Sequence, residues 1–214
     1  MAGRITALSA QKKNPNRLNV EVEGEFAFGV DRLVGAWLQV GQELSDEKIR
    51  EIVARDTAES AYLSALRFLS YRLRSKQEIL DRLLQKGYTT DQIDQVIARL
   101  EEERMVDDQR FASSWAESRQ VFRPRSKKWI ARELQMKGIQ PPQIDKALSG
   151  IGSDTQLALS AAQKASRRWK NDTYETFRQH CAAFLLRRGF SYESIREVLP
   201  IVWAEIRDGA LPDK

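Results

Sequence analysis

The chain has 214 residues, a hydrophobic share of 42% and a formal net charge of +5 at pH 7. This length and apolar share suffice for one large or two modest globular cores. No apolar run approaches the ~20 residues that a membrane helix needs, and the N-terminus lacks the apolar segment of a signal peptide. Because Cys181 is the one cysteine, a disulfide framework is excluded, and we expect a cytoplasmic protein.

The first 30 residues show the alternation of apolar and polar side chains that is typical of β-strands. Leu18, Val20 and Val22 alternate with polar residues, and the pattern resumes after Gly24 over residues 26–30. Two or three short strands do not hold a fold alone. We therefore expect a small β-ribbon that packs on the helices that follow.

Local signals indicate how this N-terminal region is connected. Glu23-Gly24 predicts a tight hairpin turn, residues 5–10 a third strand, and residues 14–16 the turn between the first two strands. Helices are predicted over residues 32–40 and 46–55.

A stretch at residues 79–97 recurs twice downstream at an offset of 51 residues, centred on Gly87, Gly138 and Gly189. A fixed period of this size indicates supersecondary units that bury their faces against one another. The matched positions around each glycine are Leu83, Leu134 and Leu185; Lys86, Lys137 and Arg188; Tyr88, Ile139 and Phe190; and Ile93, Ile144 and Ile195.

Each glycine is interpreted as a helix stop, because glycine adopts the left-handed backbone at little cost. The following helices are predicted to begin at Thr89 or Thr90, at Pro141 and at Ser191. The preceding helices open at Ser75, which forms a capping box with Glu78, and at Ser126. A further helix precedes each pair, over residues 62–73, 109–121 and 155–169.

The sequence thus predicts a mainly α-helical chain of three three-helix repeats after a small N-terminal ribbon. We expect the ribbon and its helices over residues 1–61 and the repeats over 62–108, 109–150 and 151–214. Pro200 is predicted to stop or kink the last helix, with residues 201–203 as a separate turn. Gly209 and Pro212 indicate a frayed tail.

The strongest concentration of charge lies in the middle of the chain. Residues 117–138 hold seven basic residues against only Glu117 and Glu133. A solvated face and a binding surface for acidic protein loops or nucleic-acid phosphates are about equally favoured by this pattern. The basic residues of the tract are Arg119, Arg123, Arg125, Lys127, Lys128, Arg132 and Lys137.

No pattern in the chain predicts catalysis, a metal site or a cofactor. Cys181 occupies a helical core position and is interpreted as a buried hydrophobe, and His180 has no partner pattern for nucleophile or metal chemistry. Asp107-Asp108 is interpreted as a helix cap rather than a catalytic carboxylate pair. The glycines form no phosphate-binding loop. A core role is favoured over base stacking for Trp115, Trp129 and Trp169.

The chain resembles the RecX family of bacterial recombinase regulators over residues 62–150, and more loosely beyond. The residues that carry the resemblance are Ala65-Leu66-Arg67-Phe68-Leu69, Arg72-Leu73-Arg74-Ser75, Lys86-Gly87-Tyr88, Val106-Asp107-Asp108-Gln109-Arg110-Phe111-Ala112, Glu133-Leu134 and Lys137-Gly138-Ile139. The sequence departs from the family at Arg123-Pro124-Arg125-Ser126, where members often have lysine-x-glycine.

The resemblance implies tandem three-helix repeats in a curved, elongated molecule that binds the RecA recombinase filament in its groove and limits filament growth. It implies a role in homologous recombination, DNA repair and the SOS response, with no catalytic residues and no cofactor. A basic helical-repeat protein that binds single- or double-stranded DNA is the alternative, and a helical scaffold for unrelated proteins is a third. A monomer is expected. The candidate contact residues are Arg72, Arg74, Arg119, Arg123, Arg125, Lys127, Lys128 and Arg132.

Overall fold

The computed structural model describes residues 2–208, and these residues fall into two compact units. Unit 1 comprises residues 2–73 and 79–106, and unit 2 comprises residues 74–78 and 107–208. The helix that contains residues 76–84 therefore contributes its first turn to unit 2 and its remainder to unit 1.

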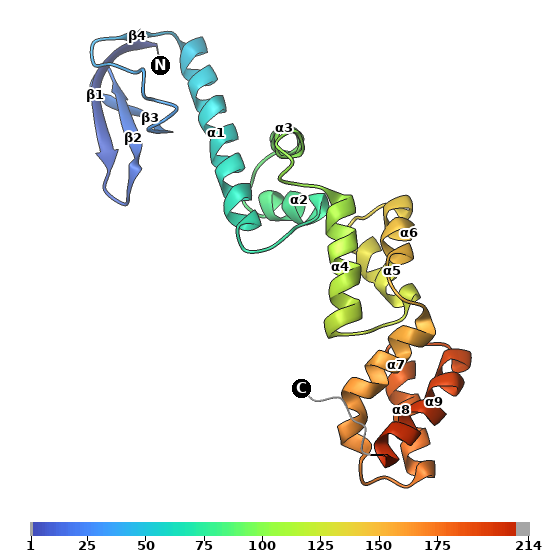
Figure 1. Ribbon diagram of the computed structural model, residues 1–214. Helices are drawn as coiled ribbons and strands as arrows, with labels where there is room; N and C mark the ends of the chain where they lie inside the picture. Colours follow the sequence, from blue (N-terminus) through green and yellow to red (C-terminus); the bar gives the residue numbers. More distant parts are fainter. Residues whose placement is uncertain (1, 209–214) are drawn as a thin grey trace. The chain divides into compact units, whose positions relative to one another are not determined.

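Unit 1 begins with a four-stranded antiparallel sheet in the order β3-β2-β1-β4 (Figure 1). The predicted hairpin turn at Glu23-Gly24 is confirmed, since both residues have positive φ, of 51° and 86°. The predicted turn at residues 14–16 is wrong: these residues belong to a strand, and the turn lies at residues 12–13, where Gln11 pairs with Asn14. The strands are β1 (Gly3–Gln11), β2 (Asn14–Val22), β3 (Glu25–Asp31) and β4 (Glu43–Leu44).

The inner face of the sheet follows the predicted alternation with one exception. Val20, Phe28 and Val30 are buried, whereas Phe26 is 60% exposed. Val20 pairs with Phe28 and Glu21 pairs with Phe26, which leaves one extra residue in β3 between these pairs. This irregularity shifts Phe26 to the other face of the sheet.

No helix forms over residues 32–40, contrary to the prediction from sequence. The segment consists of turns in which Gly35 N–H donates to the carbonyl of Asp31 (2.8 Å) and Leu38 N–H to that of Gly35 (3.0 Å). The backbone of Gly35 approaches Val30 so closely that a Cβ at this position would lie 2.8 Å from its side chain. Contact with the sheet therefore determines the conformation here.

Helix α1 (Asp46–Leu69) is one continuous helix of 24 residues, where the sequence predicted two helices over residues 46–55 and 62–73. Ser45 caps it by accepting a hydrogen bond from Lys48 N–H (3.2 Å). Its second half packs with α2 (Lys76–Leu84) and α3 (Thr90–Glu102) around a separate core. That core includes Ala61, Ala65, Ile79, Leu83, Ile93, Val96 and Leu100.

Unit 2 contains the two remaining three-helix groups, which share one continuous core from Phe111 to Ile206. In this core the leucines four places before Gly138 and Gly189, Leu134 and Leu185, are fully buried. The elements are α4 (Asp108–Phe122), α5 (Lys127–Gln135), α6 (Pro141–Ser149), α7 (Asp154–Ala165), the 3₁₀ helix η1 (Ser166–Trp169), α8 (Tyr174–Leu186) and α9 (Tyr192–Arg207).

Helix α9 does not end at Pro200, and Ile201 to Trp203 continue it rather than forming a separate turn. Pro200 is exposed, so the carbonyl that its missing N–H leaves unpaired faces the solvent side. Val198, Leu199 and Val202 anchor the opposite side in the core and outweigh the local break. The predicted tail at Gly209 and Pro212 lies outside the described residues.

The structure confirms a mainly α-helical chain with three three-helix repeats and a small N-terminal antiparallel ribbon. The helix starts predicted after the glycines are also confirmed, because Thr89 and Ser191 are N-caps and α6 begins at Pro141. Over the described residues, no helix is both long and apolar enough to span a membrane.

Candidate partner-binding surface

The centre of the basic tract is the connection between α4 and α5. Helix α4 ends at Phe122, and Pro124 is buried. Ser126 caps α5 by accepting a hydrogen bond from Trp129 N–H (3.2 Å), and its own N–H donates to the carbonyl of Arg188 (3.2 Å). A buried proline and an anchored cap therefore fix the loop that presents Arg123 and Arg125.

Two of the predicted contact residues belong to an internal network centred on Glu133. Arg119 Nε lies 2.6 Å from Glu133 Oε2, and Arg125 Nη1 lies 3.4 Å from Glu133 Oε1. Trp115 Nε1 donates to the same carboxylate (2.9 Å), and the Arg119 guanidinium lies 4.3 Å from the Trp115 ring centroid. This half-buried network stabilises the packing of α4 on α5 and leaves Arg119 less available to a partner than its sequence position indicates.

Lys137, the residue before Gly138, is also neutralised within unit 2. Its Nζ lies 2.7 Å from Glu78 Oε1 and 4.4 Å from the Trp115 ring centroid. Glu78 lies in the first turn of α2, which belongs to the same unit. Sequence separation concealed this pair, because the two residues are 59 positions apart.

The remaining residues of the tract face solvent to different extents. Arg123, Lys128 and Arg132 are exposed and form no ion pair with any residue from 2 to 208. Lys127 is half-buried, and its backbone N–H donates to Asp154 Oδ1 (2.7 Å). Arg123, Lys128 and Arg132 are therefore the exposed cations of this tract that a partner reaches without first breaking an ion pair within residues 2–208.

Arg72 and Arg74 lie in the connection between α1 and α2, in unit 1 and unit 2 respectively. Arg72 is exposed and its Nη1 donates to the carbonyl of Leu73 (3.0 Å), whereas Arg74 is half-buried. Both side chains have contacts within the chain. A role of these two arginines in partner contact therefore stays a prediction.

The repeat glycines all have the positive φ that was predicted, 87° at Gly87, 77° at Gly138 and 85° at Gly189. Gly138 and Gly189 also lie at close contacts: a Cβ on Gly138 would lie 2.6 Å from that of Gln77, and one on Gly189 would lie 2.7 Å from Ser126 Oγ. These two glycines therefore serve packing between helices as well as helix termination.

Sequence reasoning missed three arginines that the fold of unit 2 brings to the α4–α5 connection. Arg168 lies in η1, and Arg187 and Arg188 follow α8. Burial lowers the pKa of Arg188, and the positive charges of Arg125, Arg168, Arg187 and Arg123 lower it further. Only the repeat register pointed to this place, since Arg188 stands where Lys86 and Lys137 stand in the other repeats.

Cys181, Asp107 and Asp108, which were considered as catalytic candidates, have structural roles instead. Cys181 is fully buried, which confirms the interpretation as a hydrophobe, and burial raises the pKa of its thiol to about 12. Asp107 caps α4 by accepting from Arg110 N–H (3.0 Å), as predicted. Asp108 is buried and accepts from Lys76 N–H (2.9 Å). No group of metal-binding side chains occurs among residues 2–208.

The tryptophans divide between core and surface. Trp169 is buried and Trp115 packs against the core, as predicted. Trp129 instead is half-buried beneath Arg125, whose guanidinium lies 5.3 Å from the ring centroid. The surface around the α4–α5 connection thus has cations, which attract anions, and an aromatic ring that holds the Arg125 guanidinium over its face.

Family models for RecX match most of the described chain. The model of the regulatory protein RecX N-terminal domain matches residues 3–45. Those of the first, second and third RecX three-helix domains match residues 61–100, 107–148 and 153–199.

Curated relatives and solved structures agree with these models. The chain is 34% identical over 199 residues to "Regulatory protein RecX" of Bacillus pumilus, covering 91% of this chain and 76% of the relative. It is also 34% identical over 195 residues to the Bacillus subtilis protein of the same description, covering 89% and 74%. A "Crystal structure of regulatory protein RecX" matches with a TM-score of 0.66 and 27% identity, covering 92% of this chain and 98% of that one. RecX from Lactobacillus salivarius matches with a TM-score of 0.59 and 26% identity, covering 70% and 99%.

Proposed function

The chain belongs to the RecX family of regulatory proteins, and we propose from this that it binds the RecA recombinase filament in its groove without catalysing a reaction. Binding limits filament growth, ATP hydrolysis and strand exchange, and so regulates homologous recombination during the SOS response and DNA repair. The protein acts as a monomer in the cytoplasm. The observation that carries this proposal is the complete set of RecX domains in one chain.

The tandem repeat supports a polymeric partner. In each three-helix repeat the second helix is followed by a basic residue and a glycine of positive φ. A filament presents the same surface at regular intervals, so an array of related units contacts several protomers at once. Linked contacts of this kind raise the overall affinity far above that of one unit.

The contact surface of the proposal is the α4–α5 connection with the first two turns of α5. The exposed cations there are Arg123, Lys128 and Arg132. Arg119 and Arg125 mainly stabilise the packing of α4 on α5 through their ion pairs with Glu133. Cations at an interface increase the association rate with an acidic partner and determine its register.

This assignment is tested with the double variant Arg123→Glu, Lys128→Glu, which changes only exposed side chains that have no ion pair within residues 2–208. We expect its affinity for RecA filaments on single-stranded DNA to fall by about tenfold or more, because two attractive charges become repulsive. Co-sedimentation with preassembled filaments measures the affinity, and circular dichroism should show unchanged helicity.

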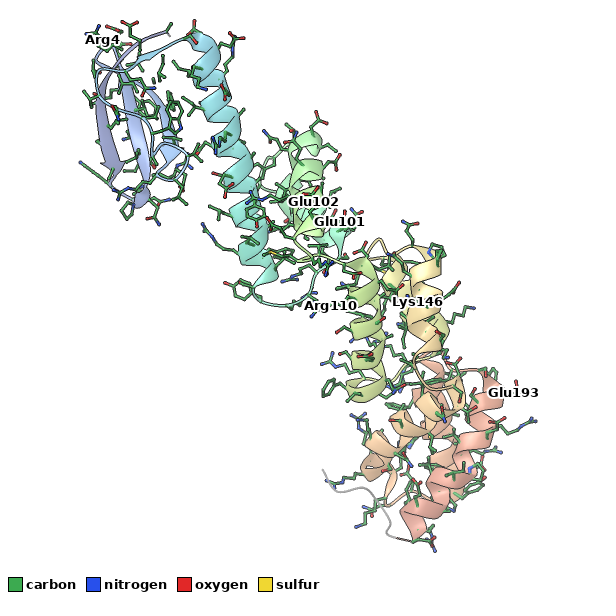
Figure 2. The ribbon with its side chains drawn as sticks, turned by 45° about the horizontal axis from the view of Figure 1, so that its top comes forward. Arg4, Glu101, Glu102, Arg110, Lys146 and Glu193 are labelled. Carbon is green, nitrogen blue, oxygen red and sulfur yellow. The ribbon has the colours of Figure 1, made fainter. Side chains whose placement is uncertain are left out.

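Lys146→Glu is the matched control, since Lys146 is an exposed residue of α6 in the same unit (Figure 2). It should bind filaments as the wild type does. Equal co-sedimentation of the double variant and the control would show that the α4–α5 connection is not the contact surface.

A further inference from the structure

The two repeats of unit 2 differ in how they neutralise equivalent cations. In the second repeat, Lys137 pairs with Glu78, and Arg119 and Arg125 pair with Glu133. An offset of 51 residues places Trp129 at the position of Glu78 and Phe184 at the position of Glu133. Aromatic rings, Trp129 in the second repeat and Phe184 in the third, therefore occupy the positions equivalent to the two carboxylates that balance Lys137, Arg119 and Arg125.

The cation at the position of Lys137 is retained, and further arginines lie around it. Arg188 stands at the position of Lys137, and its guanidinium lies 4.2 Å from the Phe184 ring centroid, with that of Arg168 at 6.0 Å. We call Arg123, Arg125, Arg168, Arg187 and Arg188 the arginine cluster, because the charges of the other four all act on Arg188.

The arginine cluster is almost devoid of negative charge. Only Arg125 forms an ion pair, with Glu133 at 3.4 Å; the other four have none to any of the described residues. Arg188 Nε is buried and has no hydrogen-bond partner there either. Unpaired buried donors and close like charges are both unfavourable. An anion from outside the chain would relieve both.

A pocket of about 200 Å³ adjoins this cluster. Its walls include Arg168, Arg187 and Phe184 together with His180, whose Nδ1 lies 2.9 Å from Asp172 Oδ2. The guanidinium groups have donors for oxyanions, and the ring of Phe184 is an apolar surface of the kind on which nucleobases stack.

We propose that the arginine cluster is a binding site for the phosphates of a single nucleic-acid strand, with one base entering the pocket beside Phe184. A strand supplies successive negative charges at short intervals, which matches a cluster of five arginines, two of them in the pocket wall, better than an isolated carboxylate does. This inference goes beyond the proposed function, because it concerns nucleic acid and does not require the recombinase.

The test measures fluorescence anisotropy of a labelled oligothymidylate with the full chain, in the absence of recombinase and over a series of salt concentrations. The double variant Arg168→Gln, Arg187→Gln removes two exposed cations. It should bind about tenfold more weakly, and the slope of log affinity against log salt should become shallower by about 1.4, or 0.7 for each phosphate contact. Arg178→Gln, on α8 and in an exposed pair with Glu175, is the control and should remain within about twofold of wild type.

A second variant, Phe184→Glu, restores the carboxylate that the second repeat has at the equivalent position. This variant should also bind the oligonucleotide more weakly. Circular dichroism establishes whether it remains folded, and if it is unfolded, the arginine double variant alone tests the proposal. Wild-type affinity and salt slope in the arginine variant would overturn the proposal. Displacement of the oligonucleotide by polyglutamate at equal charge concentration would also overturn it, and would assign the cluster to an acidic protein.

Discussion

Gly87, Gly138 and Gly189 share one backbone conformation but differ in their surroundings. A Cβ added to Gly87 would have no described atom within 4 Å, whereas one added to Gly138 would lie 2.6 and 3.1 Å from the Cβ and Cγ of Gln77. A Cβ of one residue cannot move away from another without a shift of backbone. The same sequence signal therefore has a purely conformational role at one site and an additional packing role at the other.

The matched variants Gly87→Ala and Gly138→Ala separate these two roles. Gly87→Ala should cost only the left-handed strain, about 1–2 kcal/mol, which lowers Tm by about 2–8 °C. Gly138→Ala adds the clash with Gln77 and should lower Tm clearly further. Thermal unfolding followed by circular dichroism gives both values. An equal decrease in Tm for the two variants would show that the close contact with Gln77 does not add to the loss of stability.

At the scale of residues, the sequence predicted the conformations and helix caps that depend on neighbouring residues. It did not predict contacts between residues far apart in the chain. The positive φ of the glycines and the caps at Ser75, Ser126 and Asp107 follow from neighbouring residues, and the structure has them. The role of Glu133 as the acceptor for Arg119 and Arg125 depends on how α4 packs on α5. No pattern along the chain reports that packing.

Helix α1 shows how a tertiary contact overrides a local signal at the scale of elements. The sequence predicted a break near the polar stretch that follows Arg55, yet the helix is continuous. Asp56, in this stretch, is buried: its Oδ2 lies 2.6 Å from Arg17 Nη2, and its Oδ1 accepts from Asp31 N–H at 2.6 Å. The buried residue that faces the sheet here is the polar Asp56, whereas the helical pattern predicts an apolar residue at a buried position.

Replacing Asp56 with alanine should therefore weaken unit 1. The change removes the carboxylate that pairs with the half-buried Arg17 guanidinium and leaves the Asp31 N–H without its acceptor, and we expect a loss of about 2–4 kcal/mol in the free energy of unfolding. Urea denaturation measures this loss. Glu51→Ala is the control on the same helix; because it removes only an exposed pair with Lys48, it should change stability by less than about 1 kcal/mol. Similar effects of the two variants would contradict a structural role for Asp56.

The other incorrect predictions of elements have the same cause. Residues 32–40 have helical spacing, but contact between Gly35 and Val30 leaves them as turns against the sheet. Pro200 is a helix breaker by itself, but the buried residues on the opposite side of α9 maintain the helix through it. In each case, packing decided between two locally acceptable conformations.

At the scale of the whole molecule, the 51-residue period predicted the repeats, because identical units must bury equivalent faces. The family resemblance predicted membership of the RecX family, which the domain matches show. The arginine cluster could not be predicted from the sequence. Its members come from the α4–α5 connection, η1 and the end of α8, which meet only in the folded unit.

The most direct test of a filament regulator is the rate of ATP hydrolysis by RecA recombinase on single-stranded DNA as this protein is added. We predict inhibition at well below one molecule per recombinase monomer, because one bound array blocks the growth of a filament that contains many monomers. That inhibition should persist when the DNA is raised in excess. Inhibition only at concentrations that saturate the DNA, or none at all, would contradict the account and leave nucleic-acid binding as the function of this basic surface.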